Sequence, residues 1–136
     1  MTTIPEKLQS IKEEFSIFSD PRDKYVYLVD LAKNSEGLSA ENQCEKNRIH
    51  GCTSQAWVTG EIRQDNFFFK TDSDAMIVKG LLSLIERSFN GHTAKEILAI
   101  DGKDFLESVG LDRAISSQRA NGFSNAINKI QKELLI

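Results

Sequence analysis

One cysteine beside a glycine has the clearest chemical potential in this sequence. Cys52 lies in the segment NRIHGCTSQ, residues 47–55, between a polar stretch and the first predicted strand. Gly51 permits a sharp turn, and a turn at a strand end can present a side chain outward. A thiol in that position could act as a nucleophile. The alternative is that Cys52 is a small apolar residue, buried at the start of the strand.

Three basic residues come shortly before this cysteine in the chain, namely Lys46, Arg48 and His50. If their charges also lie close to the thiol in space, they favour the thiolate, which is the nucleophilic form of cysteine. We therefore expect the pKa of Cys52 to be lowered.

The second cysteine, Cys44, belongs to a polar segment where burial is hard to justify. It could be a resolving thiol for Cys52 or an incidental loop residue. We favour the incidental role, because nothing fixes the geometry that a disulfide needs. A metal site would require both cysteines together with His50 or His92, and none of these has a paired ligand spacing. We therefore expect no bound metal.

Charged residues near two predicted helix starts are the remaining candidates. Asp72 and Asp74 flank the expected start of a central helix, where capping and attraction to the helix dipole are the ordinary roles of a carboxylate. Arg119 lies at the expected start of the last helix, where a cation interacts unfavourably with the dipole. That placement indicates a specific partner for Arg119, although exposed arginines are common.

Length and composition limit the class of protein. The chain has 136 residues, 40% of them hydrophobic and 27% charged, which suits a domain that folds without disulfides or metal. Its net charge is −3 and it has no basic block, so the charge pattern of a nucleic-acid binder is missing. Residues 1–10 lack a secretory apolar stretch, and no segment is apolar enough to span a bilayer. We expect a cytoplasmic protein that binds neither nucleic acid nor membrane.

Apolar spacing predicts two helices in the first third of the chain, followed by a long loop. The first helix begins at a capping box formed by Thr3 and Glu6, and the second begins at Asp20 with Pro21 as its first residue. Polar residues 34–47 then form a loop that is long for so small a domain. Long ordered loops are often functional.

Two strands and several helices follow this loop. Residues 55–63 and 67–71 have the β-branched and aromatic content of a hairpin. Residues 77–89 have too many apolar positions for one stripe, which predicts a central, buried helix capped by Asp72 or Ser73. The chain ends with a short helix from Thr93 through Leu98, a helical turn near 105–109 and a last helix from Ser116 or Ser117. This order predicts an α+β fold, with a small antiparallel sheet packed against helices, in one domain over residues 1–136.

Three separated motifs carry a family resemblance. They are RIHGCTSQAW at 48–57, DSDAMIVKGL at 72–81 and SQRANG at 117–122. In this order they resemble the SufE family of cysteine desulfuration proteins, including its CsdE branch. The resemblance extends from the helix around Tyr25 to the final helix. It implies an α+β fold similar to the IscU scaffold proteins, with the reactive cysteine at the tip of a loop.

The resemblance also implies roles for particular residues. Cys52 matches the sulfur-accepting cysteine of the family's Gly-Cys-x-Ser motif, whereas Cys44 has no counterpart. Asp74 and Arg119 match an acidic and a basic position around the cysteine loop and the partner surface. The expected supporting residues are Arg119, Asp74, Gly51, His50 and Ser54.

The activity that the resemblance implies is sulfur relay. A pyridoxal-phosphate cysteine desulfurase, similar to SufS or CsdA, holds sulfur as a persulfide, and the Cys52 thiolate attacks the outer sulfur. The protein then shelters the persulfide on Cys52, stimulates the desulfurase and passes the sulfur to an iron–sulfur scaffold or another acceptor. No cofactor is expected in this chain, because pyridoxal phosphate belongs to the partner. Whether the chain forms a homodimer through a helix face stays open.

Two other classes of protein stay open on the residues alone. An iron–sulfur or metal scaffold of the IscU type would need more thiolates than two cysteines supply. A two-cysteine redox protein would use Cys44 together with Cys52, and rapid, reversible disulfide formation would reveal it.

Overall fold

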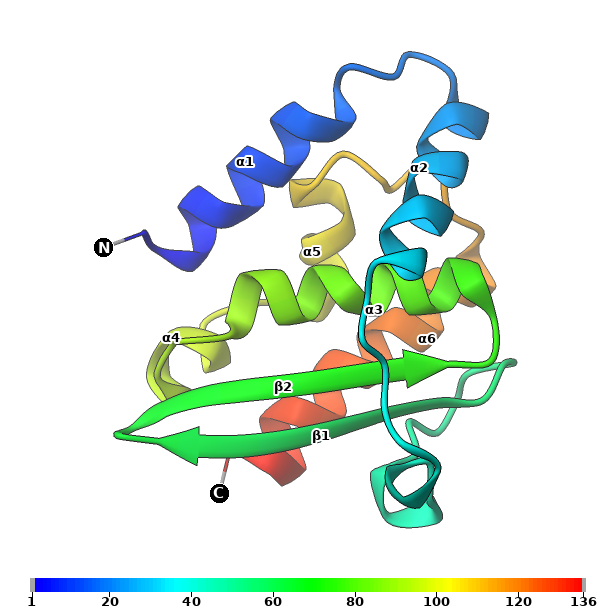
Figure 1. Cartoon of the computed structure of the whole chain (residues 1–136). Helices are drawn as coiled ribbons and strands as arrows, with labels where there is room; N and C mark the ends of the chain where they lie inside the picture. Colours follow the sequence, from blue (N-terminus) through cyan, green and yellow to red (C-terminus); the bar gives the residue numbers. More distant parts are fainter. Residues whose placement is uncertain (1, 136) are drawn as a thin grey trace.

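The computed structural model describes residues 2–135, which form six α-helices and one two-stranded antiparallel sheet (Figure 1). The helices are α1 (Ile4–Phe15), α2 (Pro21–Lys33), α3 (Met76–Phe89), α4 (Ala94–Leu98), α5 (Gly102–Ser108) and α6 (Ser117–Lys129). Strands β1 (Ala56–Arg63) and β2 (Asn66–Ser73) form the sheet. Two 3₁₀ turns, η1 (Ala40–Asn42) and η2 (Glu45–Asn47), lie in the long loop, and a π turn, η3 (Ile130–Leu134), extends α6. The predicted α+β fold is confirmed.

Local sequence signals place most of the helix starts. Thr3 Oγ1 accepts a hydrogen bond from Glu6 N, while Glu6 Oε1 accepts one from Thr3 N, which completes the predicted capping box of α1. Asp20 caps α2 ahead of a proline, as expected. Thr93 caps α4 and Ser116 caps α6, also as the sequence predicts.

The start of α3 differs from the prediction. Its N-cap is Ala75, which offers no side-chain hydrogen bond, so neither Asp72 nor Ser73 caps the helix. Asp74 does not cap it either, because Asp74 Oδ1 accepts a hydrogen bond from the backbone of Gln55. Asp72 and Asp74 accept hydrogen bonds from the loops before β1. Near α3, Asp72 pairs with Lys79 and Ser73 Oγ accepts from Ala75 N, but neither side chain caps the helix.

The hairpin turns tightly between its strands. Its register runs from Ala56 opposite Ser73 to Arg63 opposite Asn66. The two residues between the strands, Gln64 and Asp65, both have positive φ, at 51° and 70°. A two-residue turn with this backbone matches the twist of the strands that it joins. The predicted hairpin is confirmed.

The long loop lies against one face of the hairpin, and its path crosses the sheet in Figure 1. Asp72 Oδ2 accepts hydrogen bonds from Leu38 N at 2.8 Å and from Gln43 Nε2 at 3.2 Å. Trp57 lies opposite Asp72 in the ladder, so both residues share this face. Trp57 is buried on this face.

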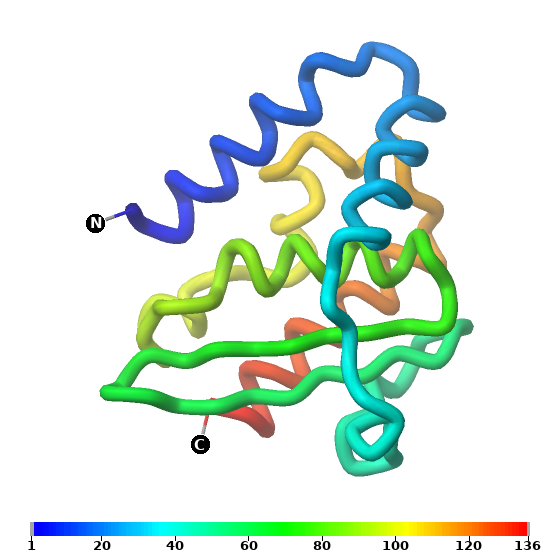
Figure 2. The backbone as a smooth tube through the Cα atoms, viewed as in Figure 1, coloured from blue at the N-terminus to red at the C-terminus, as the bar shows by residue number. Residues whose placement is uncertain are grey.

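Helix α3 is the centre of the fold. It runs along the hairpin, with α1 and α2 on its other side and α6 behind it (Figures 1 and 2). As the sequence predicts, its apolar residues are buried on several sides: Ile77, Leu81, Leu82, Leu84, Ile85 and Phe89. No helix within residues 2–135 is long and apolar enough to cross a membrane.

A row of five phenylalanine rings connects the hairpin to α6. The rings belong to Phe67, Phe69, Phe89, Phe105 and Phe123, and successive centroids are 6.2, 6.4, 6.0 and 5.0 Å apart. Such spacings are typical of favourable aromatic pairs. The row therefore joins β2, α3, α5 and α6 in one core.

Candidate functional site

The cysteine loop, residues 48–55, leads from η2 into β1 and is fixed near both ends. Near its start, Ile49 is buried and its N–H donates to a carbonyl at the beginning of β1, at 2.8 Å. At its end, Asp74 Oδ1 accepts from Gln55 N at 3.0 Å, and Ser73 Oγ donates to Gln55 O at 2.7 Å. The structure thus places Asp74, an expected supporting residue, at the end of this loop.

Cys52 is half-buried, and its sulfur rests on α6. Sγ donates a hydrogen bond to Gly122 O, with 3.5 Å between the two atoms. A Cβ on residue 122 would lie only 2.9 Å from Sγ, so glycine is what lets the thiol approach the helix so closely. We call this contact between Cys52 and Gly122 the cysteine seat.

Gly122 had no assigned role in the sequence, although it belongs to the third motif. The available signal was its place inside a predicted helix, where glycine costs about 1 kcal/mol relative to alanine. A glycine at such a position indicates a close approach of another group. Here that group is the thiol of Cys52.

Gly51 makes the turn that brings Cys52 to α6. Its φ is +85°, in the left-handed region that favours glycine. A Cβ at this position would collide with the side chain of Asn125, whose Nδ2 donates to Gly51 O at 3.4 Å. The predicted turn is present, but it directs the thiol toward α6 instead of outward. Asn125 was not among the predicted residues.

A small cavity lies beside the cysteine seat. It is lined by Cys52, Thr53 and Ser54 of the loop, by Val78, Leu81 and Leu82 of α3, and by Gln118, Arg119, Gly122 and Phe123 of α6. It holds about 10 Å³ of free space, close to what one water-sized sphere needs. Two expected supporting residues, Ser54 and Arg119, therefore lie beside the thiol.

The seat changes the acidity of the thiol in the direction opposite to our expectation. Burial raises the pKa of Cys52, and the Arg48 cation lowers it with a smaller effect. The hydrogen bond to Gly122 O also requires the thiol proton. The prediction of a lowered pKa is therefore wrong, and the resting thiol is protonated at neutral pH.

The other basic residues before Cys52 do not act on the pKa of its thiol. His50 is exposed, and its Nε2 lies 3.3 Å from Glu45 Oε1. Lys46 is also exposed. Of the three predicted cations, Arg48 alone contributes to the pKa of Cys52, and its Nη1 also lies 3.7 Å from Glu45 Oε2. The positions of the three cations in the sequence therefore led to an overestimate of their effect on the pKa of Cys52.

Arg119 has a partner within the chain. Its guanidinium carbon lies 5.7 Å from the centroid of the Tyr25 ring on α2. This cation–π contact helps to hold a cation at a helix start where the dipole disfavours it. Tyr25 and the neighbouring Val26 are exposed, so Arg119 connects the cavity to an apolar surface of α2.

Cys44 lies outside the cysteine seat. It is exposed at the residue before η2, and both cysteines are free. Within residues 2–135, no group of three or more histidine, cysteine or acidic side chains is arranged to hold a metal ion. Of the two thiols, that of Cys52 is the one that lies beside the small cavity.

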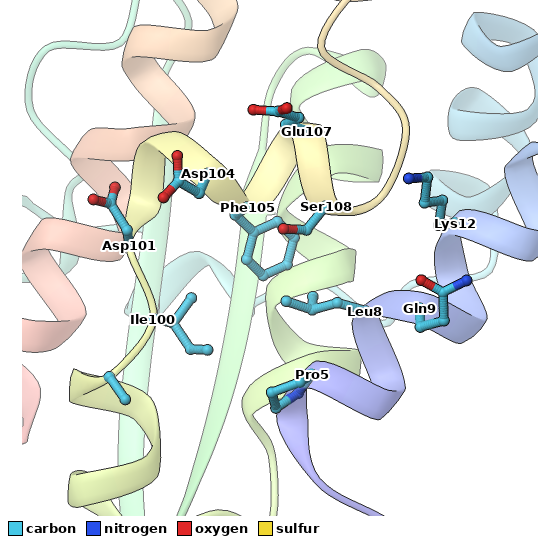
Figure 3. A pocket seen from close by; sticks show the side chains of 11 residues that line it. Pro5, Leu8, Gln9, Lys12, Ile100, Asp101, Asp104, Phe105, Glu107 and Ser108 are labelled. Carbon is cyan, nitrogen blue, oxygen red and sulfur yellow. The ribbon is translucent and has the colours of Figure 1, made fainter.

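A larger cavity lies elsewhere in the fold. It has a volume of about 750 Å³ and lies between α1 and α5, where Leu8, Lys12, Ile100, Asp104 and Phe105 are among its lining residues (Figure 3). None of the predicted site residues lines it. Cavity size alone would therefore have pointed away from the predicted site residues.

The fold and the site together define a class: a small α+β protein that holds one thiol against a helix, beside an apolar cavity. The SufE family, described as "Fe-S metabolism associated domain", matches residues 9–134, and the chain belongs to this family. The resemblance stated from the motifs is confirmed. Membership ties the chain to sulfur transfer in iron–sulfur metabolism.

Several known proteins are similar to the chain along most of its length. A SufE-like protein of Synechocystis sp. is 34% identical over 133 residues, covering 98% of this chain and 83% of the relative. A SufE-like protein of Rhizobium meliloti is 35% identical over 130 residues, covering 93% of each. The SufE-like protein 1, chloroplastic/mitochondrial, of Arabidopsis thaliana is 34% identical, and the match covers 97% of this chain and 36% of the plant protein.

The chain is also similar in fold to a solved structure. It is the solution structure of a hypothetical protein from Thermus thermophilus, with a TM-score of 0.77. The match covers 98% of this chain and 96% of the other, at 18% sequence identity. At this identity the likeness concerns the fold.

Proposed function

We propose that Cys52 accepts sulfur from the persulfide of a cysteine desulfurase and carries it toward iron–sulfur cluster assembly. The observation that carries this proposal is the cysteine seat, in which Sγ lies against Gly122 beside a small cavity. Membership of the SufE family supports the link to iron–sulfur metabolism.

The transfer is a thiol–persulfide exchange. The Cys52 thiolate attacks the outer sulfur of the donor persulfide, so that a new S–S bond forms at Sγ while the S–S bond of the donor breaks. The donor cysteine leaves as a thiolate, and Cys52 becomes the persulfide. The transferred sulfur keeps its oxidation state, so no oxidant is needed.

The acidity of the seated thiol sets a condition on this reaction. Burial raises the pKa of Cys52, so the thiol is protonated at rest and is a poor nucleophile. The proton has to leave when Sγ comes out of the seat or when cations of the partner approach it. The seat therefore favours reaction in the complex over reaction with small molecules in solution.

The cavity suits the product of the transfer. A persulfide is one sulfur longer than a thiol, and the free space beside Sγ has room for about one atom. Leu81 and Phe123, which line this space, are apolar and buried. An apolar wall would keep water and small thiols from the labile sulfur.

The partner supplies the remaining chemistry. Pyridoxal phosphate belongs to the desulfurase, of the SufS or CsdA kind, and removal of its sulfur by Cys52 frees its cysteine for another turnover. This accounts for stimulation of the desulfurase. Arg119 and Asp74 would orient the cysteine loop or contact the partner. We place the reaction in the cytoplasm, where thiols stay reduced.

Mass spectrometry tests the proposal. After incubation with a SufS-like desulfurase and free cysteine, we expect one added sulfur on the peptide that contains Cys52, and faster consumption of cysteine. Cys52→Ser should abolish both effects, because the variant lacks the accepting thiol. Cys44→Ser is the matched control and should retain both. A Cys52→Ser variant that stimulates the desulfurase as well as the parent does would sink the proposal.

A further inference from the structure

One face of α6 contacts the cysteine loop and the turn before it at three points. Gly122, Asn125 and Lys129 follow one another at spacings of three and four residues, which places them on one face of the helix. Gly122 O accepts from Cys52 Sγ at 3.5 Å, and Asn125 Nδ2 donates to Gly51 O at 3.4 Å. The third contact extends this row by one further turn of the helix.

Lys129 makes that third contact through a side chain that is largely covered. Its side chain is only 9% exposed, and Nζ lies 3.4 Å from Glu133 Oε1. The same Nζ donates to the carbonyl oxygen of Lys46, in η2, at 3.3 Å. A lysine loses favourable hydration when it is buried, so a buried lysine needs such partners. One of the two partners of Lys129 is the backbone that leads into the cysteine loop.

Asn125 is matched to the conformation of Gly51. The left-handed backbone of Gly51 leaves the space that the Asn125 side chain fills, and a Cβ there would collide with it. The nearby Asn128 is exposed, and no hydrogen bond from its side chain to the loop is present. The two asparagines thus form a natural pair, one in contact with the loop and one not.

We infer that Asn125 and Lys129 are positioning residues that clamp the chain before Cys52 onto α6 and thereby keep the thiol in its seat. The clamp holds the backbone at residue 46 and at residue 51, immediately before the cysteine. It controls how often Sγ leaves the seat, and hence how fast the thiol meets a reaction partner. The inference deepens the proposed function, on which it rests for the importance of Cys52.

The surroundings of Sγ allow the clamp to be separated from electrostatics. The charged side chains that face Cys52 are Arg48 from its own loop and Arg119 from α6, while the lining residues from α3 are apolar. Lys129 is a further cation, and its Nζ donates to the backbone that leads into this loop. Removal of a cation by itself disfavours the thiolate and raises the thiol pKa, whereas release of the loop reduces burial and lowers it. The two explanations predict shifts of opposite sign.

Alkylation of the thiol by iodoacetamide tests the clamp without any partner protein. The background is Cys44→Ser, so that Cys52 is the single thiol. Asn125→Ala and Lys129→Met should each raise the alkylation rate at neutral pH by roughly three- to tenfold, the scale of one lost hydrogen bond. The pH profile should move to lower pH in both variants, because the thiol spends more time in water.

The matched controls are Asn128→Ala and Lys132→Met, which make the same chemical changes on α6 and η3 outside the clamp. Both should leave the rate and the pH profile unchanged. Unchanged or slower alkylation in Asn125→Ala and Lys129→Met would overturn the clamp, and so would an equal acceleration in the controls. Asn125→Ala removes one exposed hydrogen bond, so it keeps the test decisive if Lys129→Met fails to fold. Failure of the proposed function would appear separately, as a parent protein that takes up no sulfur.

Discussion

The two cysteines lie in the same connection between α2 and β1, yet their environments are opposite. Cys44 is exposed beside a short 3₁₀ turn, and its side chain makes no capping hydrogen bond. Cys52 is half-buried against Gly122 and next to an apolar cavity. Exposure gives a thiol ready access to any electrophile, whereas a carrier has to protect its cargo. Under the proposed function, it is the structure around Cys52, more than the thiol itself, that would suit the chain to carry sulfur.

The substitution Gly122→Ala should remove most of this contrast. The new methyl group would lie 2.9 Å from Sγ and force either the thiol or α6 to move. Overpacking of this kind costs about 1–3 kcal/mol, so alkylation of Cys52 should accelerate by roughly tenfold or more relative to Cys44. Quantifying both modified peptides in one sample gives the ratio directly.

The control for that substitution is Gly102→Ala on α5, where an added Cβ meets no atom closer than 3.4 Å. It should leave the ratio of the two alkylation rates unchanged. If Gly122→Ala also preserves the ratio, the cysteine seat is not what protects Cys52.

The substitution Asp72→Asn tests the other side of the comparison, the loop that carries Cys44. Asn keeps an acceptor but loses the charge that Leu38, Gln43 and Lys79 share at Asp72. The free energy of unfolding should fall by about 1 kcal/mol, as urea denaturation would measure. Hydrogen exchange should accelerate at residues 38–47, with little change in the alkylation of Cys52. If Asp72→Asn accelerated the alkylation of Cys52 as strongly as hydrogen exchange at residues 38–47, the two regions would form one structural unit.

The smallest expected effect comes from Arg48→Met. Arg48 is the cation that lowers the pKa of Cys52, so its removal should raise this pKa further and reduce the thiolate at any given pH. Because its side chain is 40% exposed, water weakens the effect, and alkylation should slow by about two- to threefold. The difference between parent and variant should shrink at high salt. A pH profile identical to that of the parent would contradict this assignment.

Elements whose signals are local could be predicted from the sequence. Capping by Thr3, Asp20 and Thr93 uses atoms within three residues, so the helix starts follow from neighbouring side chains. The two strands could also be predicted from the sequence, but the burial of their residues could not. Ile62 shares a predicted face with Ala56 and Val58, yet it is 57% exposed, because the turn end of the hairpin projects beyond α3 (Figure 1).

The site was harder to predict, because its decisive contacts join distant parts of the chain. The motif identified Cys52, but its partner Gly122 lies 70 positions later in the sequence. Asp72 likewise accepts a hydrogen bond from Leu38, 34 positions earlier, and does not cap the helix that follows it. The direction of the pKa shift failed for the same reason, since burial by α6 outweighs the cation next to the cysteine. The sequence shows which cations lie near Cys52 along the chain, but it does not show the burial that raises the pKa of the thiol.

Phe123 belongs both to the row of rings and to the wall of the cavity. A smaller residue there would widen the space beside Sγ and also open a gap against Phe105. Substitutions at Phe123 that enlarge the cavity would therefore also weaken the core. The α6 side of the cavity is thus tied to the core, whereas Thr53 and Ser54 on the loop side do not belong to the row of rings.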